Sequence, residues 1–318
     1  MTLDATLLAL RPDPHRPSRA DARDGSCVSP PLLFRRADGR CGARNFLGVV
    51  AMDPAAEHLA HAVVDRVAQS DLVESLDGVL ALAYAPGASM SGLQAQRGQL
   101  DQLLCARGLH PNLGALLLLD SGFPGAASRR CQRELESVTC DGVAQLSAHG
   151  LPVAAFLDQA CRSVGTLARV AARRRRLAST WPELVFGLSG TLRPEGMGAG
   201  LRNALARLVA RGATVVFPES MSAALLQEAS VPVSAYGQRV VRPGWVPMAG
   251  SPVHADAAPG LVAAGAQLLI EATAVSMPAN VFSDAVPRLR LPVHRDADWM
   301  LARISEALAG QGGSAARD

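Results

Sequence analysis

The chain has 318 residues, with 31 basic and 28 acidic side chains, a formal net charge of +3 and a hydrophobic fraction of 49%. Every basic residue is an arginine, because the sequence contains no lysine. This absence excludes a Schiff base, a pyridoxal phosphate aldimine and a Walker-type phosphate loop, which all need an ammonium nitrogen. The small net charge and an aromatic fraction of 4% argue against a nucleic-acid partner.

The sequence shows no sign of membrane insertion or of a disulfide framework. No apolar run reaches the roughly 18 residues that cross a bilayer, and Asp4 stands where a signal peptide has a basic start. The six cysteines form no CxxC pair, and a chain of this length folds without disulfides. We therefore expect a cytoplasmic protein with reduced thiols and no membrane partner, while paired oxidation of Cys131 and Cys140 stays open.

The first half of the chain predicts a leader followed by alternating strands and helices. Residues 1–31 mix Pro, Arg, Asp and Ser without apolar periodicity, which is typical of a flexible leader. Apolar runs of strand length then alternate with segments of helical spacing. The expected strands are 46–52, 78–84 and 115–120, and the expected helices carry Leu59 to Val67, Leu100 to Arg107 and Phe156 to Leu167. The four arginines at 173–176 are interpreted as the solvated end of the last of these helices.

Trp181-Pro182 indicates a boundary, after which the same alternation returns. We expect strands at 183–189, 213–217, 266–272 and 288–293, helices near 201–209, 256–264 and 301–308, and an irregular connection over 230–258. Strands that alternate with helices favour an α/β fold with two units of parallel sheet flanked by helices. The predicted domains are 32–180 and 181–318.

Ligands in open α/β sheets bind at the carboxyl ends of strands. Asp53-Pro54 follows the first predicted strand and forms a good helix start. The nearby His58, His61 and Asp65 invite a metal or acid–base interpretation. However, they share the face opposite the apolar stripe of their helix, which predicts a solvated surface.

A glycine-rich segment follows the strand at 183–189. Gly196 and Gly198 resemble half of a dinucleotide-binding fingerprint, but Leu201 occupies the third glycine position. A helix start of this kind can hold a carboxylate or small anion, with Arg193 or Arg202 as the counter-charge. The alternative is a flexible glycine loop without a ligand.

The densest polar cluster is FRRADGRCGARN at 34–45, in which Arg35, Arg36, Arg40 and Arg44 surround a tight Asp-Gly turn and Asn45 precedes a strand. Four guanidinium groups within ten residues suit bidentate capture of carboxylates. They equally suit a structural hairpin whose arginines pair across a domain interface. The residues alone leave both interpretations open.

This stretch also resembles the start of the catalytic region in the altronate/galactarate dehydratase family, which has a similar Arg, Asp-Gly, Gly and Arg-Asn pattern before a strand. Further similar segments follow in the same order, at 77–84, 110–119, 184–190, 211–220 and 260–273. The resemblance spans about 32–295 and extends to the large subunit of a sulfolactate sulfo-lyase. It implies elimination of water or sulfite from a hydroxy acid, helped by iron or another divalent ion.

The sequence departs from the family where metal-type ligands are expected. Tyr84 and Ala88 stand in place of a family His and Cys, and Gly122-Phe123-Pro124 replaces a Gly-Cys-Glu. The family's Cys-Gly-Gly-Ser-Asp and Thr-Gly-Arg-Gly-Thr-Pro stretches are also replaced, at 190–194 and 273–278. None of the six cysteines lies at a family cysteine position, so we predict neither a metal site nor a cofactor.

Two functional hypotheses from different classes result. The first is a divergent hydro-lyase that acts on a sugar acid or related hydroxy acid. Its substrate-binding residues would be Arg35, Arg36, Arg44, Asn45 and Arg193, and its acid–base candidates are Glu219, His110 and Tyr84. The second is a non-catalytic relative that binds an anionic metabolite, or that serves as a regulatory or structural subunit beside an active paralogue or a small-domain subunit. The expected partners are a small anionic hydroxy acid and either further copies of this chain or such a subunit.

Overall fold

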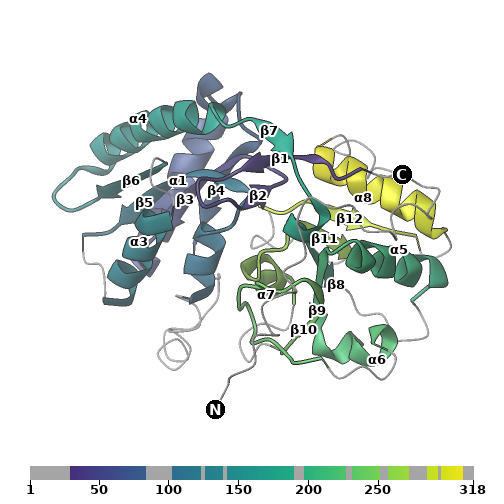
Figure 1. The fold of residues 1–318 in the computed structure, drawn as a ribbon. Coiled ribbons are helices and arrows are strands. Elements are labelled where there is room, and N and C mark those ends of the chain that lie inside the picture. The colour runs from purple at the N-terminus through teal and green to yellow at the C-terminus, as the bar shows by residue number, and fades with distance from the viewer. Residues whose placement is uncertain are drawn as a thin grey trace, which may run out of the picture.

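The structure is a computed structural model that describes residues 29–83, 102–122, 126–138, 142–189, 197–226, 231–250, 257–271, 285–292 and 295–310. Two parallel sheets flanked by helices form its two halves, and a small antiparallel sheet lies between them (Figure 1). The predicted fold class is thereby confirmed. Most of the predicted leader lies outside the described residues.

The first half is a four-stranded parallel sheet in the order β4-β3-β5-β6. Its strands are β3 (Phe46–Ala51), β4 (Gly78–Leu82), β5 (Leu113–Asp120) and β6 (Val143–Ser147). Helices α1 (Glu57–Ala68) and α4 (Val153–Ala172) cover one face, while residues 102–108 and α3 (Ala126–Val138) cover the other. Alternate residues of β5 face the two helix layers: Leu117 packs against α1 and α4, and Leu118 against the opposite layer. Burial on both faces explains why these strands are apolar without alternation.

The second half is a five-stranded parallel sheet in the order β10-β9-β8-β11-β12. Its strands are β8 (Val185–Ser189), β9 (Thr214–Pro218), β10 (Gly244–Met248), β11 (Leu268–Glu271) and β12 (Arg288–Arg290). Helices α5 (Ala199–Ala210) and α8 (Ala297–Ala309) pack on one face and α7 (Ala258–Ala263) on the other, while the short α6 (Ser222–Leu225) follows β9. Strand β10 corrects the prediction that 230–258 is irregular.

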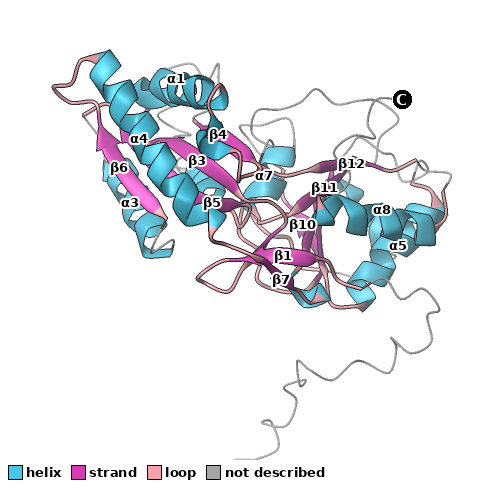
Figure 2. Cartoon of the chain, turned by 90° about the horizontal axis from the view of Figure 1, so that it is seen from above, coloured by secondary structure: helices cyan, strands magenta, loops and turns pink. Residues whose placement is uncertain are grey.

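The small antiparallel sheet has the order β2-β1-β7. Its β1–β2 hairpin agrees with one of the two interpretations of 34–45, whereas β7 was not predicted. It consists of β1 (Leu32–Arg35), β2 (Cys41–Gly42) and β7 (Arg176–Ala178), and Figure 2 shows β1 and β7 side by side between the two larger sheets. Helix α4 ends at Ala172, so the interpretation of 173–176 as a solvated helix end is wrong for Arg176. The Arg176 guanidinium lies over the Phe34 ring, 4.6 Å from its centroid, and donates to the Ala43 carbonyl at 3.1 Å.

The described helices differ from a membrane span in length and hydropathy. None of them combines enough residues with enough apolar character to cross a bilayer.

Candidate functional site

Two buried acids mark the topological switch point of the four-stranded sheet. The chain continues from β3 to β4 on one side, and β5 lies on the other, so a crevice is expected at the carboxyl ends of β3 and β5. Asp53 follows β3 and is 5% exposed, while Asp120 ends β5 and is 2% exposed. Buried carboxylates need hydrogen-bond donors, and both acids have them.

Both carboxylates hold the backbone turn that follows β5. Asp53 accepts the Ala56 N–H at 3.0 Å as a helix cap and the Ser121 N–H at 2.9 Å. Asp120 accepts the Gly122 N–H at 2.8 Å, and it also accepts the side chains of Ser147 at 2.7 Å and Gln145 at 3.1 Å. These bonds fix the shape of the sheet edge where a ligand is expected.

Sequence reasoning identified Asp53 as a cap but missed Asp120. The available signal was an acid at the end of the otherwise apolar run ALLLLD, because a charge that terminates a buried strand requires donors around it. On the nearby α1, His58, His61 and Asp65 are exposed, which confirms the predicted solvated surface.

Arg36, from the arginine-rich stretch, uses its guanidinium for hydrogen bonds within the chain. Its guanidinium donates to the Pro111 carbonyl at 2.5 Å, to the Asn45 side-chain oxygen at 2.8 Å and to the Arg44 carbonyl at 2.7 Å. Burial, together with the nearby charges of Arg174 and Arg40, lowers the pKa of Arg36 to about 9. The side chain therefore joins the hairpin to the start of β5.

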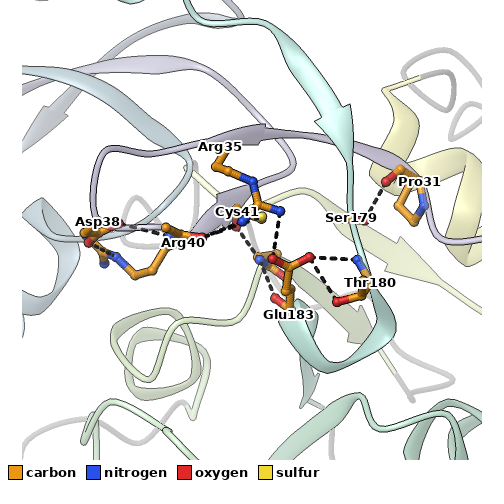
Figure 3. A network of polar contacts seen from close by, with 10 residues as sticks. Pro31, Arg35, Asp38, Arg40, Cys41, Ser179, Thr180 and Glu183 are labelled. Carbon is orange, nitrogen blue, oxygen red and sulfur yellow. Dashed lines mark hydrogen bonds and ion pairs between the residues drawn. The ribbon is translucent and has the colours of Figure 1, made fainter. Parts of the chain in front are cut away.

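The other predicted substrate-binding residues nearby also bond to the chain. Asn45 donates from its side chain to the Ala171 carbonyl at the end of α4, at 3.0 Å. Arg44 donates to the Ala307 carbonyl at 3.0 Å, near the end of α8, where a cation suits the helix dipole. Arg35 forms an ion pair with Glu183 at 2.8 Å (Figure 3). The motif thus connects elements of both halves.

His110 is a buried bridge between the two parallel sheets. Its Nδ1 accepts the Asn112 N–H at 3.1 Å, so Nε2 carries the proton and donates to the Ala266 carbonyl at 3.0 Å. The residue is 3% exposed, and burial lowers its pKa to about 3. His110 is therefore neutral near pH 7 and occupied by structural hydrogen bonds.

The predicted acid–base residues do not gather at one place. His110 contacts Ala266, just before β11, whereas Glu219 is exposed just after β9. Both strands belong to the same parallel sheet, so these positions lie at its opposite ends, about 15 Å apart for strands of this length. Tyr84 and Arg193 lie outside the described residues, so their placement stays a prediction.

A cavity of about 750 Å³ lies at the amino ends of the strands of the five-stranded sheet. Ligands in open α/β sheets are expected at the carboxyl ends instead. Its wall includes Glu183 before β8, Thr214 at the start of β9 and Gln267 before β11. The four-stranded half contributes His110 and residues of α3. Figure 3 shows one side of this wall, with the Arg40–Asp38 and Arg35–Glu183 ion pairs.

The described part of the chain lacks the residue cluster of a metal centre. It holds no group of three or more His, Cys, Asp or Glu side chains that could bind a metal ion. The described residues therefore do not fit the divalent ion that the family resemblance implies.

Residues 33–172 match the protein family described as D-galactarate dehydratase/Altronate hydrolase, second domain. The predicted family resemblance is confirmed over these residues. No curated protein matches the chain significantly. The matched segment contains the complete four-stranded sheet together with Asp53 and Asp120.

Proposed function

We propose that this chain is a divergent hydro-lyase of the altronate/galactarate dehydratase type, which eliminates water from a sugar acid or related hydroxy acid. One observation carries the proposal: the matched residues 33–172 form a whole parallel sheet whose switch-point edge is shaped by two buried carboxylates. Open α/β sheets bind their ligands at this edge. The arginine-rich motif supports the edge indirectly, by fixing the framework behind it.

The elimination needs a base and an acid. The base removes the proton from the carbon beside the substrate carboxylate, and the acid protonates the departing hydroxyl, which leaves as water. The resulting enol rearranges to a 2-keto acid, so no oxidant or reductant is required. Of the three predicted acid–base groups, Tyr84 is the one that follows a strand of the matched sheet, two residues after β4. We assign Asp53 and Asp120 a positioning role.

A second function, binding of the hydroxy acid without turnover, is favoured by one observation. Arg36, Arg44 and Asn45, which would grip the substrate carboxylate, donate to acceptors within the chain instead. A protein that keeps the sheet framework but uses the arginine-rich motif only for structural hydrogen bonds would bind a ligand without catalysing the elimination. Such a protein could serve as a subunit beside an active paralogue.

The test is turnover of a panel of aldonates and aldarates by the full chain, with and without added Fe²⁺ or Mn²⁺. Semicarbazide trapping of the 2-keto product measures the rate, and NMR confirms loss of the hydroxyl. We expect at least one substrate to react, and we expect Asp120→Asn to slow the reaction by about 100-fold because the turn after β5 loses an anchor.

Glu219→Gln is the matched control, because Glu219 is exposed at the edge of the other sheet and should leave the rate unchanged. Tyr84→Phe should abolish turnover if the Tyr84 hydroxyl is the base or the acid of the elimination. Binding of a sugar acid without turnover of any panel member would refute the hydro-lyase and support the second function. An Asp120→Asn variant as active as the unmodified protein would refute the positioning role.

A further inference from the structure

The cavity at the amino ends of the five-stranded sheet carries more positive than negative charge. Two of its charged pairs are internally balanced: Arg40 binds Asp38, and Glu183 binds Arg35. The charged side chains that remain on the wall are Arg130, Arg239, Arg242 and Glu134. Three arginines therefore face one carboxylate, and the cavity attracts anions.

The partners of these side chains sharpen the charge balance. Glu134 accepts the Cys105 thiol at 3.4 Å, and Arg242 donates to the Pro232 carbonyl at 2.5 Å. Arg130 and Arg239 form no hydrogen bond or ion pair with any described residue, and both are exposed. Burial lowers the pKa of Arg40, and the nearby charge of Arg239 contributes to the lowering. Arg130 and Arg239, which come from opposite halves of the chain, are therefore available to bind an anion.

A large part of the inner wall of the cavity is apolar. It is lined by small aliphatic side chains and by three buried thiols: Cys41, Cys105, Cys131, Ala106, Val185 and Ala263. Burial raises the pKa of Cys41 to about 11, and a hydrogen bond with Cys131, burial and the Glu134 carboxylate raise the pKa of Cys105. The thiols of Cys41 and Cys105 are therefore uncharged near pH 7 and behave as small apolar groups.

The polar groups of the inner wall are already engaged. The Gln267 side chain bonds to Cys41, Glu183 and Val185, the Thr214 hydroxyl donates to the Arg242 carbonyl, and His110 has both ring nitrogens occupied. A polyhydroxy acid bound here would leave hydroxyl groups without partners, which is costly in a buried site. The wall favours an apolar ligand body.

We infer that this cavity is a second binding site, which takes an amphipathic organic anion. The anionic group binds Arg130 and Arg239, with Arg242 beside them, and the apolar body lies against the thiols and small aliphatic side chains. A volume of about 750 Å³ suits a medium-sized organic molecule. This site lies at the amino ends of the five-stranded sheet, whereas the proposed hydro-lyase edge lies at the carboxyl ends of β3 and β5. The inference therefore does not depend on the hydro-lyase function.

Calorimetric titration of the full chain with octanoate tests the inference. Octan-1-ol supplies the same apolar body without charge, inorganic phosphate supplies charge without the body, and galactarate supplies a polyhydroxy anion. We expect octanoate to bind at least about tenfold more tightly than each of the other three, which is about 1.4 kcal/mol.

Exposed side chains make the charge variants safe for folding. The double variant Arg130→Gln/Arg239→Gln should weaken octanoate binding by at least about tenfold and leave octan-1-ol binding unchanged. The matched control Arg175→Gln removes an exposed arginine that does not line the cavity and should change neither. Ala106→Leu narrows the apolar wall and should weaken octanoate while leaving phosphate binding as it was.

Several outcomes would overturn the inference. They are no binding of octanoate, equal binding of octan-1-ol or of phosphate, tighter binding of galactarate, and an unchanged affinity of the double arginine variant. Dehydration of a sugar acid by that double variant at the rate of the unmodified protein would show that the two sites are separate. In the converse experiment, an Asp120→Asn variant that loses dehydration but still binds octanoate would also show that the two sites are separate.

Discussion

The strongest consequence of the structure for stability is a pH dependence that originates at His110. Protonation of its ring would place a hydrogen on Nδ1, where the ring now accepts the Asn112 N–H. Two donors would then face each other inside the protein. Burial is the main reason that the pKa falls from 6.5 to about 3, and the charges of Arg40, Arg36 and Arg107 add to it.

The sign follows from proton linkage. The folded-state pKa lies below the unfolded one, so the unfolded chain binds more protons between pH 6.5 and pH 3, and stability falls as the pH is lowered through that window. With these two values, His110 costs about 2 kcal/mol between pH 7 and pH 5. Most carboxylates stay ionised in this range, so the loss can be assigned to histidine.

The assay is urea unfolding at pH 7, 6 and 5, followed by the fluorescence of the three tryptophans. His110→Gln keeps a donor toward Ala266 but has no titrating group. It should therefore lose most of the pH dependence, although it should be less stable than the unmodified protein at pH 7. His58→Gln, which changes an exposed histidine, should keep the full dependence. The reasoning fails if the unmodified protein is equally stable at pH 7 and pH 5, or if His110→Gln keeps the same slope.

Two further predictions concern the hairpin before β3. Arg36→Met should lower the free energy of unfolding by about 3 kcal/mol, because three part-buried acceptors lose their donor. Arg35→Met breaks a partly exposed ion pair and should cost less than about 1 kcal/mol. Equal urea midpoints of these two variants would contradict the assignment. Gly42→Ala would place its Cβ 2.0 Å from the Pro111 carbonyl oxygen and should cost about 2 kcal/mol or more, whereas Gly250→Ala meets no atom within 4 Å and should be nearly neutral in thermal unfolding.

Much of the fold could be predicted from the sequence, because buried parallel strands leave a clear apolar signal. The strand predicted at 115–120 lies within β5, and the helix on Leu59 to Val67 is α1. Strand β10 escaped prediction for a physical reason. It contains Pro247 within a region rich in proline and glycine, and proline in a strand is tolerated when that strand lies at a sheet edge, as β10 does.

The roles of the predicted site residues were harder to foresee. Arg36, Arg44 and Asn45 donate mostly to backbone carbonyls, which every residue type provides, so no partner is visible in the sequence. The amino-end cavity is similarly hidden, because its charged arginines come from α3 and from the loop before β10, more than a hundred residues apart. Only the fold brings them together.

The absence of lysine acquires a structural meaning at the hairpin. A guanidinium offers five donors in a fixed plane, and Arg36 uses all three of its nitrogens to bind the neighbouring Arg44 and Asn45 and the distant Pro111. An ammonium group is a single compact charge and could not hold the same three groups in one plane. Arg36 thus holds the hairpin whose Arg35 and Arg44 bond to Glu183 and Ala307 of the other half. The cavity lined by Arg130 and Arg239 lies between these two halves. Structural and ligand-directed arginines therefore depend on each other: loosening Arg36 should weaken octanoate binding even though Arg36 does not line that cavity.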